Sequence, residues 1–307
     1  MKAGGGRGHQ PETGMASFTE IARAKVNLTL RVLGRRPDGY HDLDSIAAFA
    51  DCADSLTLEP GDLGLTITGP GSAACGDAND NLVIRAARLL AERVPGLKLG
   101  HFTLDKHLPV AAGIGGGSAD AAAALRLLAK ANGIALNDAR LFEAARLAGA
   151  DVPVCIASHA CVMGGVGENL TMLDLPPLSC VMVNPRVAVA TKDVFTALGL
   201  RAGQLRVGVD EILEAVTLPG AGASAGEWII QLSGGVNDLE APALRVQPVI
   251  GEVLAALRKT QGVQLARMSG SGATCFALYD DAVSADRAAQ AIALTHPQWW
   301  VHAGTLS

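Results

Sequence analysis

Aromatic residues and excess positive charge are both scarce in this sequence. Phe, Trp and Tyr make up 4% of its 307 residues, and 25 Lys and Arg stand against 30 Asp and Glu without forming a basic run. A protein that binds a phosphate backbone needs a basic face. The charge therefore argues against a nucleic-acid partner and fits a small-molecule partner better.

The cysteines and the apolar residues lack several familiar patterns. The six cysteines include no Cys-x-x-Cys pair, which argues against the usual zinc and thioredoxin-like signatures. No stretch reaches the length of a membrane span, and no signal-peptide pattern opens the chain. We therefore expect a cytoplasmic protein with no membrane partner and no metal-ligating side chains.

The length and composition present in the chain favour two folded domains. At 49% hydrophobic and 18% charged residues, the chain has enough apolar content for two cores. A chain of this length is longer than a common single domain, so two domains that share one cleft are expected. Residues 1–16 are polar and glycine-rich, and we interpret them as a disordered leader. We place the boundary between the domains near residue 165, giving parts at 17–165 and 166–307.

Apolar periodicity predicts a mixed α+β protein. The alternating segment 18–34 is strand-like and is followed by a turn at 36–39, and residues 81–94 have helical spacing with Asp80 as the N-cap. The other predicted elements are strands at 56–58, 63–67, 101–105, 155–163, 180–184 and 275–279, and helices at 118–131, 138–147, 192–197 and 249–258. Residues 219–226, rich in Gly and Ala, are predicted to form a loop.

The strongest local signal is a glycine-rich loop that leads directly into a predicted helix. Residues 108–120 read LPVAAGIGGGSAD, with four glycines in the five positions 113–117. Glycines let a backbone approach an anion closely, and the helix supplies free N–H groups. The loop is not a Walker A motif, because no Lys follows its last glycine, nor a dinucleotide fingerprint, because Ser118 replaces the third glycine. It predicts a phosphate site, with a tight strand-to-helix turn as the alternative.

A second glycine-rich element, MSGSGAT at 268–274, lies far downstream. Two such loops, each with hydroxyl side chains between small residues, suit a site that surrounds a triphosphate and its metal from two sides. Independent turns are the alternative. A third element, GGVG at 164–167, has no hydroxyls and is predicted to be a structural turn.

Three polar residues outside the loops are candidates for chemistry. Lys25 and Asn27 lie on one face of a predicted strand, because strand side chains repeat every two residues. Asp151 lies between a predicted helix and a predicted strand, among apolar neighbours. A surface lysine and a helix-capping aspartate are the alternatives for Lys25 and Asp151.

Five segments taken together resemble one enzyme family. In chain order they read AKVN at 24–27, PDGYH at 37–41, GIGGGS at 113–118, GADVP at 149–153 and GSG at 270–272. This combination resembles the 4-diphosphocytidyl-2-C-methyl-D-erythritol kinases of the non-mevalonate (MEP) isoprenoid pathway, which are members of the GHMP kinase superfamily. The resemblance covers nearly the whole chain from Phe18 onward. One departure is Ala119, where related loops often carry a second serine.

The resemblance implies ATP-dependent phosphorylation of the 2-hydroxyl of 4-diphosphocytidyl-2-C-methyl-D-erythritol, with ATP and Mg²⁺ as cofactors. Asp151 is implied to accept the proton of the alcohol, while Lys25 keeps that carboxylate ionised and holds the hydroxyl in line. The implied ATP-binding residues are Lys106, Pro109, Gly113, Gly115, Gly116, Gly117 and Ser118. The implied substrate-binding residues are Asn27, Tyr40, His41, Asp151, Thr191 and Phe195. Among these, Tyr40 and Phe195 are implied to enclose the cytosine ring and His41 to bind its polar edge.

The resemblance also implies a two-domain GHMP kinase fold. It has an N-terminal ATP-binding domain like domain 2 of ribosomal protein S5 and a ferredoxin-like C-terminal domain that completes the substrate site. We expect a monomer or a weak homodimer. Another GHMP kinase, acting on homoserine, mevalonate or a sugar, is the first alternative, although it would not need the Tyr40/His41 pair. A non-catalytic nucleotide-binding protein is the second, and the presence of both Lys25 and Asp151 argues against it.

Overall fold

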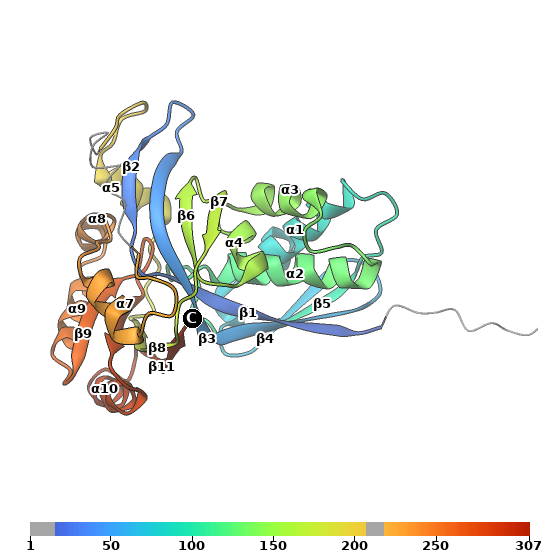
Figure 1. Cartoon of the computed structure of the whole chain (residues 1–307). Coiled ribbons are helices and arrows are strands. Elements are labelled where there is room, and N and C mark those ends of the chain that lie inside the picture. The colour runs from blue at the N-terminus through green and yellow to red at the C-terminus, as the bar shows by residue number, and fades with distance from the viewer. Residues whose placement is uncertain (1–15, 207–217) are drawn as a thin grey trace, which may run out of the picture.

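The structure is a computed structural model that describes residues 16–206 and 218–307 (Figure 1). The leader predicted for residues 1–16 lies outside the described residues, apart from its last residue. The strands are β1 Phe18–Asn27, β2 Arg31–Arg35, β3 His41–Pro60, β4 Gly64–Thr68, β5 Gly100–Asp105, β6 Cys161–Gly165, β7 Asn169–Met172, β8 Leu178–Asn184, β9 Val263–Met268, β10 Cys275–Tyr279 and β11 Trp300–Leu306. The α-helices are α1 Leu82–Ala91, α2 Gly116–Asn132, α3 Ala139–Ala148, α4 Val152–Ala157, α5 Thr191–Leu198, α7 Ala225–Ser233, α8 Glu240–Val246, α9 Val249–Arg258 and α10 Ala282–Thr295.

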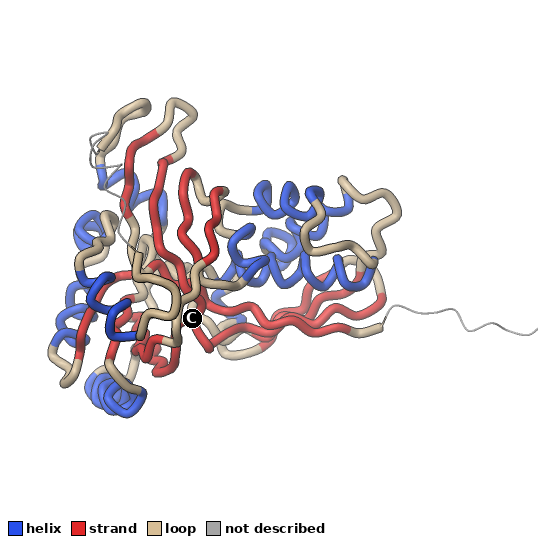
Figure 2. The backbone as a smooth tube through the Cα atoms, viewed as in Figure 1, coloured by secondary structure: helices blue, strands red, loops and turns tan. Residues whose placement is uncertain are grey.

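The long strand β3 organises the described strands into one connected sheet, drawn in red in Figure 2. It pairs antiparallel with β1, β2, β5 and β6, and the order along the sheet is β4-β5-β3-β11-β8-β10-β9. The link to β11 is narrow, with Leu306 opposite Ala50. It is reinforced by reciprocal backbone hydrogen bonds between Phe49 and Ser307. Residues near the end of the chain therefore connect its two halves.

Helices cover the sheet in two groups. The helices α1 to α4 lie together over β1 and β3 to β5 (Figure 1), and their alanines and leucines form one core with Phe49 and Phe102. The helices α9 and α10 pack on the strands of the second half around Val181, Cys275 and Tyr279. None of the described helices is long and apolar enough to cross a membrane. The α+β class predicted from periodicity is confirmed.

The central helix α2 illustrates how composition determines burial. Its sequence GGSADAAAALRLLAKAN is dominated by alanine, the strongest helix former, and its small side chains allow close packing on all sides. The residues Ala121–Ala124 are fully buried. Gly133, with φ of 66°, ends the helix in the left-handed conformation that favours glycine. The helix can therefore run through the protein interior with its N-terminus directed at the glycine loop.

Four sequence predictions about local structure need correction. The strand predicted at 155–163 is wrong over its first half, which is the short helix α4; Pro153 occupies its first turn, where proline is favoured. The helix predicted from residue 81 is capped by the Asn81 side chain, not by Asp80. The short strand predicted at 56–58 is the end of the 20-residue strand β3. In the loop predicted at 219–226, α7 already begins at Ala225.

Candidate active site

A cavity of about 660 Å³ opens where the two halves of the chain meet. The loop before α2, the N-terminus of α5 and the second glycine-rich element all contribute to its wall. Most of the residues implied by the resemblance line it. These are Lys25, Asn27, Lys106, Pro109, Gly113, Gly115, Gly116, Gly117, Ser118, Asp151, Thr191 and Phe195. Tyr40 and His41 are not among its lining residues.

The phosphate loop, defined here as residues 107–115, delivers the N-terminus of α2 into this cavity. Gly113 and Gly115 adopt φ of 73° and 62°, conformations that favour glycine. No side chain caps the first turn of α2. Its N–H groups, together with the positive end of the helix dipole, are therefore available to an anion.

The second glycine-rich element, residues 268–274, packs directly against the phosphate loop. The Ser269 hydroxyl donates to the Gly113 carbonyl oxygen at 2.9 Å, and the Thr274 N–H donates to the Ala112 carbonyl oxygen at 3.0 Å. A Cβ on Gly113 would lie 2.6 Å from the Ser269 carbonyl oxygen, and one on Gly270 would lie 2.9 Å from the Gly113 carbonyl oxygen. The two glycine loops thus lie against each other with no room for a side chain at Gly113 or Gly270.

Lys25 and Asp151 form an ion pair beside this loop. Lys25 Nζ lies 2.9 Å from Asp151 Oδ2, and the lysine is 3% exposed while the aspartate side chain is 39% exposed. The Lys25 N–H also donates to the Ile114 carbonyl oxygen at 2.9 Å, which fixes the strand to the phosphate loop. Asp151 occupies the N-cap of α4 without its side chain capping the helix. Neither the surface-lysine alternative nor the capping alternative fits these contacts.

Hydroxyl and amide groups of both halves of the chain also line the cavity, at Asn27, Ser45, Thr191 and Ser271. Asn27 Nδ2 donates to Ser45 Oγ at 2.7 Å, and the Asn27 N–H donates to Ser269 Oγ at 3.1 Å. Thr191, the first residue of α5, shares a 2.9 Å hydrogen bond with Ser271. Sequence reasoning missed Ser45 and Ser271, although Ser271 lies within the glycine-rich element that it had singled out.

The aromatic residues of the predicted base site are arranged differently from the expectation. His41 stacks on Phe195 with ring centroids 4.3 Å apart, so it covers one face of Phe195. Tyr40 is 62% exposed. Burial, followed by the nearby Arg35 charge, lowers the pKa of His41, and its Nε2 has no hydrogen-bond partner within the described part of the chain. The His41 imidazole therefore carries a buried nitrogen that the described residues leave without a hydrogen-bond partner.

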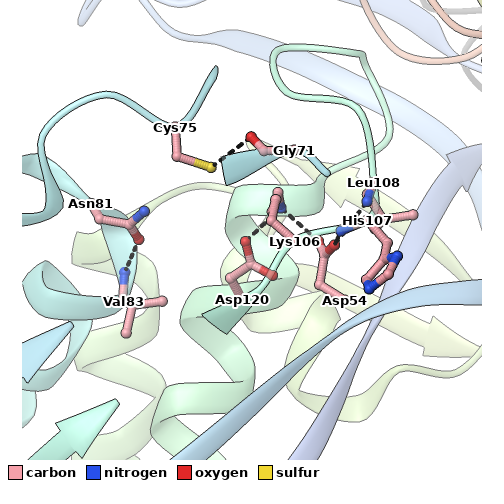
Figure 3. A network of polar contacts seen from close by, with 9 residues as sticks. All are labelled: Asp54, Gly71, Cys75, Asn81, Val83, Lys106, His107, Leu108 and Asp120. Carbon is pink, nitrogen blue, oxygen red and sulfur yellow. Dashed lines mark hydrogen bonds and ion pairs between the residues drawn. The ribbon is translucent and has the colours of Figure 1, made fainter. Parts of the chain in front are cut away.

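Lys106 lies under the phosphate loop, bound to two carboxylates that sequence reasoning missed (Figure 3). These are Asp54 on β3 and Asp120 on α2. Lys106 Nζ would lie 3.3 Å from a Cβ placed on Gly116, which puts the ammonium next to the loop backbone. The third glycine element, 164–167, spans the end of β6 and the turn into β7, as predicted, and its Val166 and Gly167 also line the cavity.

Two protein-family models match the chain. GHMP kinases N terminal domain matches residues 81–165, and GHMP kinases C terminal matches residues 213–297. Similar curated proteins carry the name 4-diphosphocytidyl-2-C-methyl-D-erythritol kinase. One of those from Rhodopseudomonas palustris is 69% identical over 95% of this chain and 98% of its own length. The one from Nitrobacter winogradskyi is 66% identical over 96% of each chain.

Solved structures give a similar result. The crystal structure of a 4-(cytidine 5'-diphospho)-2C-methyl-D-erythritol kinase is 34% identical, with a TM-score of 0.73 over 94% of this chain and 99% of that chain. The crystal structure of homoserine kinase from Cytophaga hutchinsonii has a TM-score of 0.68 over 98% of each chain. At 19% identity, that second likeness concerns the fold alone.

Proposed function

The chain belongs to the 4-diphosphocytidyl-2-C-methyl-D-erythritol kinase family of GHMP kinases, and from this premise we propose how its site performs the reaction. The protein is an ATP-dependent small-molecule kinase. It transfers the γ-phosphate of ATP to the 2-hydroxyl of 4-diphosphocytidyl-2-C-methyl-D-erythritol, giving the 2-phosphate and ADP, as a cytoplasmic step of the MEP isoprenoid pathway. The observation that carries the mechanism is the Lys25–Asp151 pair beside the uncapped N-terminus of α2.

Asp151 acts as the general base in this proposal. Its carboxylate takes the proton of the 2-hydroxyl while the new oxygen–phosphorus bond forms and the bond from the γ-phosphorus to the bridging oxygen of ADP breaks. The Lys25 ammonium, 2.9 Å away, orients this carboxylate. The Asp151 side chain is 39% exposed, so one side of its carboxylate is open to the acceptor.

The phosphate loop contributes position and charge stabilisation. Phosphoryl transfer depends on these more than on covalent chemistry. The N–H groups of Gly116, Gly117 and Ser118 lie in the first turn of α2, where they can receive phosphate oxygens. Contacts of Gly113 with the second glycine-rich element hold the loop in this conformation before ATP binds.

The cavity wall includes the oxygen donors of Ser118 and Asp151, which would help to hold a magnesium ion that arrives bound to ATP. In the described ranges, no group of three or more His, Cys, Asp or Glu side chains could hold a metal ion by itself. Mg²⁺ usually keeps waters and binds through nucleotide phosphates with few protein oxygens. We propose that it enters with ATP, and its chemistry there is to neutralise phosphate charge.

Acceptor-dependent ADP release tests the function directly. We expect the purified protein with ATP and Mg²⁺ to release ADP with 4-diphosphocytidyl-2-C-methyl-D-erythritol. Methylerythritol phosphate without the cytidine, homoserine and mevalonate should give far less, because they lack the nucleobase. Equal rates with the uncytidylated acceptor would contradict the substrate assignment, and ATP binding without ADP release for any acceptor would support a non-catalytic protein.

Replacing Tyr40 should affect the acceptor and not ATP. Stacking of an aromatic side chain on a base contributes about 1–3 kcal/mol, so Tyr40→Ala should raise the acceptor KM by roughly one to two powers of ten. The exposed Tyr40 ring is available to cover a base. Steady-state kinetics with each substrate varied in turn would measure this change.

Phe142→Ala provides the matched control, because Phe142 is an exposed aromatic residue on α3 outside the cavity. It should leave both KM values unchanged. An unchanged acceptor KM in Tyr40→Ala would remove Tyr40 from the base site. A parallel rise in the ATP KM would indicate a general defect of the site instead.

A further inference from the structure

One cation and two carboxylates are buried together under the phosphate loop (Figure 3). Lys106 Nζ lies 2.5 Å from Asp54 Oδ2 and 2.7 Å from Asp120 Oδ2. The exposed fractions of Lys106, Asp54 and Asp120 are 3%, 1% and 2%. We refer to these three residues as the buried triad.

The triad connects both ends of the phosphate loop. Lys106 immediately follows β5 at the loop entrance, and Asp120 lies near the start of α2, just after the loop exit. Asp54 Oδ1 accepts hydrogen bonds from the His107 N–H at 2.6 Å and the Leu108 N–H at 2.8 Å. Asp54 thus holds the entrance of the loop. Lys106 bonds to Asp54 at this entrance and to Asp120 in the first turns of α2, so it connects the two ends of the loop.

Asp120 is costly to the fold in this position. Asp54 already provides Lys106 with an opposite charge, so the second carboxylate leaves the triad with more negative than positive groups. Burial raises the pKa of Asp120 to about 7. Its Oδ1 is buried with no hydrogen-bond partner among the described residues. Buried carboxylates without full compensation reduce stability, so the stability of the fold does not account for Asp120.

We propose that Asp120 is a positioning residue for ATP, which acts through Lys106 to hold the start of α2 against the entrance of the phosphate loop. This inference rests on the proposed function, because it concerns the nucleotide site of the same kinase. The triad sets the separation of the loop ends before the nucleotide arrives. Without Asp120, ATP has to order the loop as it binds, which lowers the affinity for ATP but not for the acceptor.

Asp120→Asn separates positioning from stability. The neutral amide removes the uncompensated charge and leaves the Lys106–Asp54 pair, so the melting temperature should stay within a few degrees of the wild type. We expect ATP with Mg²⁺ to bind about tenfold more weakly by calorimetry without acceptor. The acceptor KM, measured at saturating ATP, should change less than twofold. Asp120→Ala serves as the second variant if the amide does not fold.

Asp286→Asn is the control, because Asp286 is an exposed carboxylate on α10, outside the cavity and away from the phosphate loop. It should leave ATP affinity unchanged. Unchanged ATP affinity in folded Asp120→Asn would overturn the inference. Tighter ATP binding would overturn it as well, since it would show that the negative charge mainly repels phosphate. ADP release by the wild type tests the proposed function separately from this binding measurement.

Discussion

Asp151→Asn is expected to lose turnover while keeping both substrates bound. The amide is nearly the same size as the carboxylate but cannot accept the proton of the alcohol. General-base catalysis typically contributes about 10²–10⁴-fold to the rate, so kcat should fall by about that factor. Both KM values should remain within a few-fold of the wild type, because the cavity keeps its shape. Coupled ADP-release kinetics with each substrate varied in turn would measure the separation.

Asp174→Asn is a suitable control for this variant. Asp174 is an exposed carboxylate between β7 and β8, outside the cavity, and its loss should leave kcat unchanged. Near-normal kcat in Asp151→Asn would remove Asp151 as the base. A rise in both KM values with unchanged kcat would instead indicate that the Asp151 carboxylate contributes only to substrate binding, by holding Lys25 in place.

Gly113→Ala should strongly weaken ATP binding. Gly113 has φ of 73°, which costs an alanine about 1–2 kcal/mol. Its new Cβ would also lie 2.6 to 2.8 Å from three backbone atoms of Ser269 and Gly272, and backbone cannot turn aside as a side chain can. The two glycine loops would have to separate, so we expect ATP affinity to fall at least about a hundredfold by calorimetry. A thermal melt would establish that the variant is folded.

The matched control is Gly226→Ala on α7. A Cβ on Gly226 meets nothing within 4 Å, and alanine is preferred over glycine inside a helix. This variant should keep full ATP affinity and melt at the same temperature or slightly higher. Wild-type ATP affinity in a folded Gly113→Ala protein would show that the loop contact has no role in nucleotide binding.

The fold class and the positions of the glycine loops could be predicted from sequence because their signals are local. The expected GHMP kinase fold is confirmed by the family models and the crystal structure of a related kinase. The short apolar segment 152–157 fits a strand or a buried helix equally well, so α4 was missed. The domain boundary at residue 165 stays a prediction, and β7 beyond it pairs with β6.

The parts of the site that could not be predicted depend on contacts between distant segments. Asp54 shares a strand face with Leu56 and Leu58, which are fully buried, and a polar residue on such a face is a signal of a buried partner. Nothing local identifies Lys106 as that partner. The stacking of His41 on Phe195 likewise joins the start of β3 to α5. The roles assigned to the site residues stay predictions until the variants are measured.

The narrow link between β3 and β11 has a consequence for how the protein is made. Ribosomes produce the N-terminal half first, with β3 already able to pair with β1, β2, β5 and β6. Leu306, which lies opposite Ala50, and Ser307, which bonds to Phe49, are added only after all the other described residues. Until then the nascent chain carries an unpaired strand edge, a feature that promotes association between chains. The contact between the two halves of the sheet at Ala50 can therefore form only after nearly the whole described chain has been made.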